Sequence, residues 1–157
     1  MFDFFTKHKK PLFEGLCDIH NHLLPGIDDG SKSVGMSLKM LEKFDALGIT
    51  SVIATPHVYQ DLYPNTPTTI KNAFDLLTTK TLKVDGPKVH SYAAEYMIDE
   101  VFMKNLQTSM PTLLLKDEYI LVEINFFSET TLLAEASFSL LQNNITPILA
   151  HPERYHS

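Results

Sequence analysis

"ITSVIATPH", residues 49–57, is rich in β-branched residues and shows no polar–apolar alternation. An uninterrupted apolar run of this kind is typical of a strand that is covered on both faces inside a parallel sheet. Pro56 ends the run, and His57 is its last polar residue. The stretch therefore predicts a buried central strand with a histidine at its carboxyl end.

Similar apolar runs lie on either side of this stretch, and helical patterns separate them. The other predicted strands are 16–20, 89–95, 118–125 and 145–155. The first predicted helix begins near Ser33 and ends at Gly48. The second begins at Thr66, with Pro67 in its first turn, and the third covers 99–106. A last helix is predicted over 128–144, with Ser128 as its cap and a buried stripe formed by Leu132, Leu133, Ala136, Leu140 and Leu141. This alternation indicates βα units around a parallel sheet of five strands.

The composition indicates which kinds of protein the sequence can encode. With 157 residues, 44% of them hydrophobic, the chain suits one domain with a real core. The net charge is −6 and the basic residues are scattered, which argues against a nucleic-acid partner. The single Cys17 is expected to be a small core residue, and it suits a reducing cytoplasm, where we expect the protein. No apolar run approaches the roughly 20 residues that span a bilayer.

Each predicted strand ends in side chains that can bind a metal. They are His20 with His22, His57, Glu95, Glu123 and His151. A single histidine at a strand end is more often a surface residue, and a single glutamate more often pairs with a base. The carboxyl ends of parallel strands share one rim, however, so these side chains should converge, which favours a metal site. The other histidines are expected to be structural or exposed: His8, His90 and His156.

The spacing and chemistry of the donors indicate the kind of metal. His20 and His22 are two residues apart, so on a continuing strand they leave the same face, about 6–7 Å apart. Nitrogen and oxygen donors without sulfur suit Mn, Fe or Zn, and several carboxylates allow a multinuclear centre. In "GIDDG", Asp28 and Asp29 are either turn formers or a source of one carboxylate beside His57. The spacing alone leaves both possibilities open.

Five motifs, in order, carry a family resemblance: "DIHNHLLPGIDDG", "IATPH", "AAEY", "LVEIN" and "AHPERY". From about Cys17 to Tyr155 the chain resembles the PHP-superfamily protein-tyrosine phosphatases of bacterial capsule and exopolysaccharide loci. The resemblance implies an α/β fold, a PHP-type distorted (β/α)7 TIM-like barrel, of which this chain supplies about five βα units. Residues 1–15 would then be an N-terminal extension, and residues 16–157 the PHP domain.

The resemblance also implies a function and a set of ligands. Such enzymes hydrolyse phosphotyrosine on a bacterial tyrosine kinase that regulates capsule or exopolysaccharide synthesis, by means of a metal-bound water in a multinuclear cluster, usually of manganese. The implied metal sites are His20, His22 and Glu95; Glu95, Glu123 and His151; and Asp29 with His57. Asp29 is preferred to Asp28 because the family's ligand aligns with the second aspartate before the glycine.

Arg154, in "HPER", resembles the family arginine that contacts phosphate. A planar, permanently charged guanidinium suits that role because it donates paired hydrogen bonds. The alternative is a salt bridge at the rim with Glu153 or another acidic residue.

The chain departs from the family pattern at one point, because the late Asp-x-His of the family is missing. We therefore expect a domain truncated at the C-terminus, with "TPILA" as a sheet edge that self-association or another chain covers. Two alternative functions stay open: a PHP-type phosphoesterase acting on a small phosphate such as histidinol phosphate, and a truncated, inactive metal-binding or interaction domain.

Overall fold

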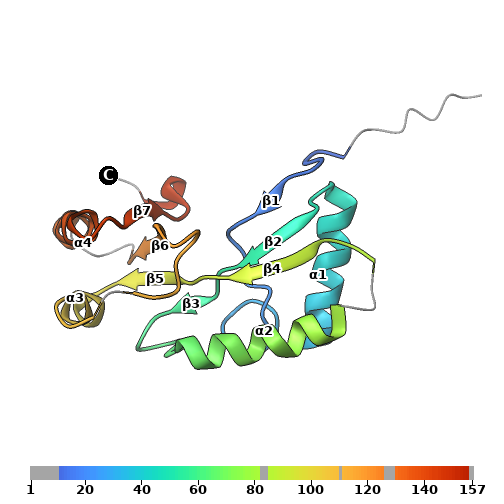
Figure 1. The fold of residues 1–157 in the computed structure, drawn as a ribbon, viewed down its shortest axis with the longest axis horizontal. Helices are drawn as coiled ribbons and strands as arrows, with labels where there is room; N and C mark the ends of the chain where they lie inside the picture. Colours follow the sequence, from blue (N-terminus) through green and yellow to red (C-terminus); the bar gives the residue numbers. More distant parts are fainter. Residues whose placement is uncertain (1–10, 82–84, 110, 126–129, 156–157) are drawn as a thin grey trace, which may run out of the picture.

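A computed structural model of the chain describes residues 11–81, 85–109, 111–125 and 130–155 (Figure 1). The strands are β1 (Cys17–Asp18), β2 (Ser51–Ala54), β3 (His57–Val58), β4 (Lys88–Tyr92), β5 (Glu95–Ile98), β6 (Tyr119–Ile124) and β7 (Thr146–Leu149). The helices are α1 (Val34–Leu47), α2 (Pro67–Thr81), α3 (Glu100–Leu106) and α4 (Thr130–Gln142), followed by the 3-10 turn η1 (Pro152–Arg154). Strands and helices therefore alternate along the chain, which confirms the predicted α/β class.

The strands form two linked parallel sheets, together called the wall, in which the strands follow one another in sequence order. β1, β2 and β4 pair side by side, and so do β3, β5, β6 and β7, all in parallel. The two sheets share two interrupted strands, because β3 continues β2 and β5 continues β4. Backbone bonds cross the interruption: Ala93 N donates to Ala54 O at 2.8 Å, and Glu95 N donates to Pro56 O at 3.0 Å. Five strand runs result, as predicted.

The two faces of this wall have different chemistry, because side chains alternate along a strand. One face packs against the helices in the main core, which includes Val52, Val122, Ile70 and Leu140. The opposite face carries a small apolar cluster of Ala93, Leu115, Leu121 and Ala150. Glu95 and Glu123 lie two residues beyond Ala93 and Leu121, so period two puts both carboxylates on this second face.

Both predicted ends of the first helix and the predicted start of the second are confirmed. The Ser33 side chain accepts a hydrogen bond from Met36 N and caps α1, and Gly48 ends this helix in the left-handed region with φ 88°. Pro67 is the first residue of α2, and Thr66 Oγ1 accepts from Thr69 N at 3.2 Å. These caps are local signals, which is why the sequence alone located them.

Several predictions were wrong or fall outside the described residues. Cys17 is exposed rather than part of the core, because β1 is a two-residue strand at the edge of the sheet. Leu141 is 56% exposed, since it lies about 100° around the helix from buried Leu140. The fifth strand ends at Leu149, well before residue 155. Ser128 lies outside the described residues.

β7 lies at one edge of the four-stranded sheet. Within the described part of the chain it pairs with β6 alone, as predicted for residues 146–150.

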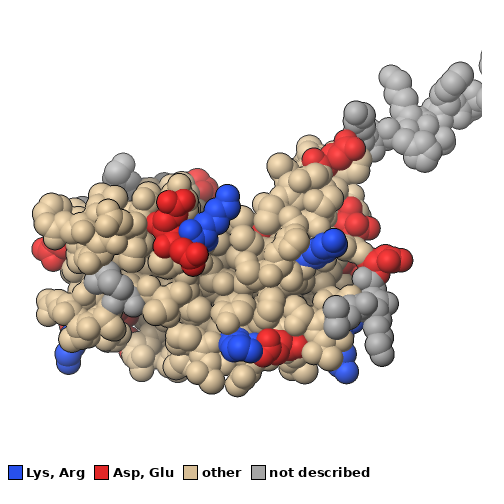
Figure 2. All heavy atoms as spheres, in the orientation of Figure 1, with Lys and Arg blue, Asp and Glu red and all other residues tan. Residues whose placement is uncertain are grey.

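The surface carries scattered positive charge. Figure 2 shows separate lysine and arginine side chains and no continuous basic patch among the described residues on the face in view. Within the same ranges, no helix has both the length and the apolar character needed to cross a membrane.

Candidate metal centre

The predicted site residues converge on one hollow of about 570 Å³. The hollow lies on the non-helical face of the sheet and draws on residues from all five strand runs. Its lining consists of His20, His22, Asp29, His57, Glu95, Glu123, His151, Glu153 and Arg154. The set contains every ligand and the arginine predicted from the sequence.

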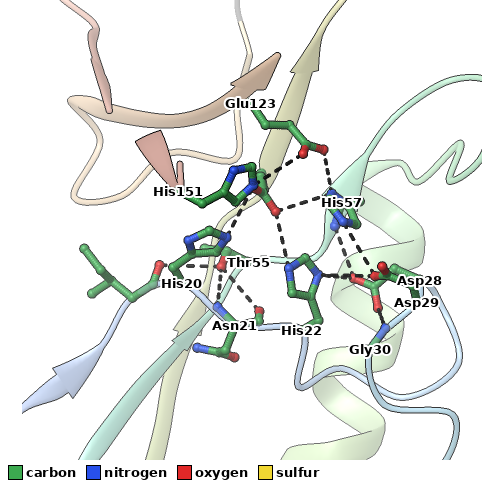
Figure 3. A network of polar contacts seen from close by, with 12 residues as sticks. His20, Asn21, His22, Asp28, Asp29, Gly30, Thr55, His57, Glu123 and His151 are labelled. Atoms are coloured by element: carbon green, nitrogen blue, oxygen red, sulfur yellow. Dashed lines mark hydrogen bonds and ion pairs between the residues drawn. The ribbon is translucent and has the colours of Figure 1, made fainter. Parts of the chain in front are cut away.

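Glu95 contacts four histidines of this cluster, and its side chain has no exposed surface. These histidines, His20, His22, His57 and His151, lie around one shared space in Figure 3. Its Oε1 lies 3.1 Å from His20 Nε2 and 3.0 Å from His151 Nε2. Its Oε2 lies 3.3 Å from His22 Nε2 and 3.3 Å from His57 Nδ1. One buried carboxylate therefore touches four imidazoles that come from three different parts of the chain.

These short contacts are mostly not hydrogen bonds. Glu95 Oε2 and His57 Nδ1 are buried and have no hydrogen-bond partner among the described residues. His57 Nδ1 lies only 2.8 Å from Glu123 Oε1, yet these two atoms are not aligned as donor and acceptor. A buried polar atom without a partner is costly, so donors that crowd a shared space without bonding to one another fit a bound cation.

Three groups of side chains place one donor atom each within 4.8 Å of the others. The groups are His20, His22 and Glu95; His22, Asp29 and His57; and His57, Glu95 and Glu123. All donors are nitrogen or oxygen, the chemistry that suits Mn, Fe or Zn. The residues present therefore fit a metal centre with more than one ion.

His57 and His151 each approach more than one carboxylate, which the sequence did not indicate. Nε2 of His57 lies 3.5 Å from Asp29 Oδ1, while its Nδ1 faces the two glutamates. His151 reaches Glu95 and also lies 3.5 Å from Glu123 Oε2. His57 thus connects the Asp29 side of the hollow to the Glu123 side.

The structure shows different environments for the neighbouring residues Asp28 and Asp29, which the sequence spacing could not distinguish. The Asp29 side chain is 60% exposed and lines the hollow. The Asp28 side chain is fully buried, and it accepts hydrogen bonds from His22 Nδ1 at 2.8 Å and from Gly30 N at 2.9 Å. Asp29 therefore faces the cavity, whereas Asp28 is buried and is not among the residues that line it.

Two polar residues that sequence reasoning missed hold the His-x-His segment. Asn21 N donates to Thr55 Oγ1 at 2.9 Å, and Asn21 Nδ2 donates to Asp18 Oδ1 at 3.0 Å. His20 N also donates to Asp18 Oδ1, at 2.9 Å. Asn21 and Thr55 are buried polar residues next to predicted ligands, and that position was the available signal. Together they fix the backbone from which both histidines project.

Charge pairing dominates the ionisation of the cluster. Burial lowers the pKa of His22, but Asp28 and Glu95 outweigh it and raise the pKa to about 10. Burial likewise opposes ionisation of Glu95, yet His20 and His22 hold the pKa of that carboxyl below its usual range. The pKa of His57 is raised against burial, chiefly by Glu123. The charged forms of His22, His57 and Glu95 are therefore favoured by their neighbours despite burial.

His151 adopts a backbone conformation that is rare for a non-glycine residue. Its φ is 32° and its ψ is 55°, in the left-handed region, immediately before Pro152. Such a conformation costs about 1–3 kcal/mol and is concentrated at functional sites. It turns the chain from β7 into η1, where Arg154 N donates to His151 O at 2.9 Å. The same turn thus positions both a histidine and an arginine at the hollow.

Arg154 is exposed at the rim of the hollow. Among the described residues Arg154 forms no ion pair with Glu153 or with another acidic residue, the alternative considered from the sequence. Its guanidinium is therefore available to an anionic ligand in the hollow.

Comparison with known proteins identifies relatives over most of the chain. The sequence model of the family described as "Capsular polysaccharide synthesis, CpsB/CapC" matches residues 16–157. Tyrosine-protein phosphatase YwqE of Bacillus subtilis is 31% identical over 139 residues, which are 88% of this chain and 55% of that protein. Tyrosine-protein phosphatase CpsB of Streptococcus pneumoniae is 27% identical over 141 residues, 89% of this chain and 58% of that protein.

The fold has a solved counterpart. A structure from the study of YwqE of Bacillus subtilis and CpsB of Streptococcus pneumoniae, described as unique metal-dependent tyrosine phosphatases, matches with a TM-score of 0.77 and 32% identity. The match covers 89% of this chain and 57% of that one, and it confirms the predicted PHP-type α/β fold. The chain spans about half the length of the curated relatives it matches. The chain belongs to the CpsB/CapC family of capsular polysaccharide synthesis.

Proposed function

We propose that this chain provides the metal centre of a phosphotyrosine phosphatase that acts in capsule or exopolysaccharide synthesis. The observation that carries the proposal is the buried Glu95 carboxylate, which four imidazoles approach within 3.3 Å. An exposed arginine opens onto the same hollow. The names of YwqE and CpsB as tyrosine-protein phosphatases support the reaction class.

The proposed ligand sets combine the family resemblance with the observed distances. His20, His22 and Glu95 would hold one ion, and Asp29 with His57 another. The remaining set is Glu95, Glu123 and His151, in which His151 Nε2 lies 3.0 Å and 3.5 Å from the two carboxylates. Manganese is the proposed metal, and iron and zinc are the alternatives that the same donors accept.

The chemistry divides between the metal and the chain. When bound, such ions lower the pKa of water toward 7 and neutralise phosphoryl oxygens. Arg154 would bind the phosphate through paired, charge-assisted hydrogen bonds. The buried carboxylates and the Asn21–Thr55 bond would fix the donor positions before substrate arrives. Cys17 is not among the residues that line the hollow, so the proposal needs no thiol nucleophile.

The proposed substrate is a tyrosine-phosphorylated segment of a bacterial kinase that regulates polysaccharide synthesis. The family description and the names of the relatives support this choice. A cytoplasmic location is part of the proposal, and the single cysteine is compatible with a reducing compartment.

Removal of metal should abolish the activity. We expect a chelator to reduce hydrolysis of a phosphotyrosyl peptide by at least about 100-fold, and added Mn²⁺ to restore it, because the proposed ions would supply the activated water. The measurement is phosphate release by this chain across a Mn²⁺ titration. His151→Ala should lose the activity, whereas the exposed α4 variant Glu135→Gln should keep it.

Three other outcomes would change the assignment. Turnover that persists in the chelator would contradict a metal-dependent mechanism. Faster hydrolysis of histidinol phosphate than of the peptide would indicate a small-molecule phosphoesterase. Bound metal without any turnover would indicate a binding domain.

Replacing the rim arginine should separate phosphate binding from metal binding. Arg154→Ala is expected to lower kcat/KM on the order of 100-fold, since it removes a donor to the phosphoryl oxygens. Arg154→Lys should recover only part of the activity, because an ammonium cannot form the paired contact. Steady-state kinetics and bound-metal analysis test this together, with exposed Lys80→Ala as the control. Unchanged kinetics in Arg154→Ala would rule out the assigned role.

A further inference from the structure

The segment Asp28–Ser31, here called the His22 clamp, contacts His22 at three points. Asp28 Oδ2 accepts a hydrogen bond from His22 Nδ1 at 2.8 Å, and Ser31 N donates to His22 O at 3.0 Å. Gly30 lies so close that an added Cβ would sit 2.2 Å from His22 Cβ. The ring, the Cβ and the carbonyl of one histidine are thus all held by one loop.

Asp28 is itself held by further hydrogen bonds. Its Oδ1 accepts from Gly30 N at 2.9 Å, and its Oδ2 also accepts from His57 N at 3.2 Å. Lys32 Nζ donates to the Asp28 backbone carbonyl at 2.7 Å. Both carboxylate oxygens are therefore occupied, and a turn toward the hollow would break three hydrogen bonds at once.

The geometry of His22 gives Asp28 a specific task. The ring has two nitrogens, and Asp28 takes Nδ1, while Nε2 lies 3.3 Å from Glu95 Oε2 at the centre of the cluster. A carboxylate on one nitrogen of a metal-binding histidine fixes the proton there, orients the ring and makes the other nitrogen a better donor. Figure 3 shows the Asp28 carboxylate beside the His22 ring, next to Asp29 and Gly30.

We propose that Asp28 is a positioning residue of the metal centre, which keeps the proton of His22 on Nδ1 and presents Nε2 to the ion. Through the His57 N–H it also anchors the start of β3, so one buried carboxylate braces two ligands. The inference rests on the proposed metal centre and adds a residue that would not touch the metal.

The test uses Zn²⁺ as a diamagnetic probe of the full chain with ¹⁵N-labelled histidine. Asp28→Ala should weaken Zn²⁺ binding roughly 10- to 100-fold in competition with a chelating dye. In the Zn²⁺-loaded protein, NMR should show a protected Nδ1 proton on His22, and Asp28→Ala should lose that protection. Asp28→Asn should retain part of the affinity, because its amide oxygen can still accept from Nδ1. Asp75→Asn, on the exposed face of α2, is the matched control.

The outcomes distinguish this inference from the proposed function. Wild-type affinity and an unchanged His22 signal in Asp28→Ala would overturn the positioning role. A lower unfolding temperature with unchanged affinity would do the same, since it would show a purely structural role. If Asp28→Ala does not fold, the comparison of Asp28→Asn with the wild type decides, and equal affinity and protection overturn the role. Failure of the wild-type chain to bind Zn²⁺ would instead overturn the metal centre itself.

Discussion

Glu95→Gln is expected to weaken Mn²⁺ binding by more than about 100-fold and to remove phosphotyrosine hydrolysis. The carboxylate belongs to two of the three donor groups, and it lies within 3.3 Å of four imidazoles. Glutamine keeps the shape of the side chain but brings an N–H₂ group into a space that holds only cation ligands. Isothermal titration with Mn²⁺ and metal analysis of the purified variant measure the loss.

The control for this variant is Glu135→Gln, an isosteric change at an exposed position of α4. It should bind Mn²⁺ as the wild type does. If Glu95→Gln retained wild-type affinity, the donor groups around Glu95 would not be the metal site, whatever the activity of the chain.

Mn²⁺ at 100 times its dissociation constant should raise the unfolding temperature by roughly 5–11 °C. Binding to the folded state alone adds about 2.7 kcal/mol at this concentration. In a domain of this size each 1 kcal/mol shifts the midpoint by about 2–4 °C. Scanning calorimetry across a Mn²⁺ titration measures the shift without reference to any substrate.

The rise in unfolding temperature with Mn²⁺ should depend on the proposed ligand residues. Glu95→Gln should show almost none of it, and the exposed variant Glu135→Gln should show all of it. A midpoint that stays constant over the titration would mean that the hollow takes up no ion in the folded state.

The sequence was sufficient for the number of strand runs and for the caps of the first helix because both depend on neighbouring residues. The β-branched run ending at Ala54 and the caps Ser33 and Gly48 need no knowledge of distant contacts. The convergence of His57, Glu95 and the other predicted ligands followed from one rule, that parallel strands share a rim. The structure places them together in one hollow.

The errors arose where tertiary packing decides. His57 and Glu95 were each predicted to end a strand, yet they are the first residues of β3 and β5. β5 continues to Ile98 because β6 pairs beside it. Cys17 follows the apolar pattern of a core residue, and only its position on a short edge strand exposes it. No local signal reports which strand lies at an edge.

The roles of Asp28 and Asp29 could not be separated by spacing, since adjacent residues of a loop point in directions that only the surrounding contacts fix. The decisive contacts, from His57 N and His22 Nδ1 to Asp28, join positions that are 29 and 6 residues away. The orientation of the His57 ring is likewise fixed by distant residues, because its two nitrogens face different carboxylates.

The sequential order of the strands has a consequence for how the protein folds. Each βα unit docks beside the unit that precedes it, so contacts stay fairly local and the wall can grow from the N-terminus during synthesis. The ligands follow the same order: His20 comes after β1, Glu95 begins β5, and His151 comes after β7. Of the proposed ligands on this chain, His151 follows the last strand, so the docking of β7 would complete the set of Glu95, Glu123 and His151. The three donor groups that precede β7 could bind metal before that step. Metal binding to those groups and to His151 would therefore report two different steps of folding.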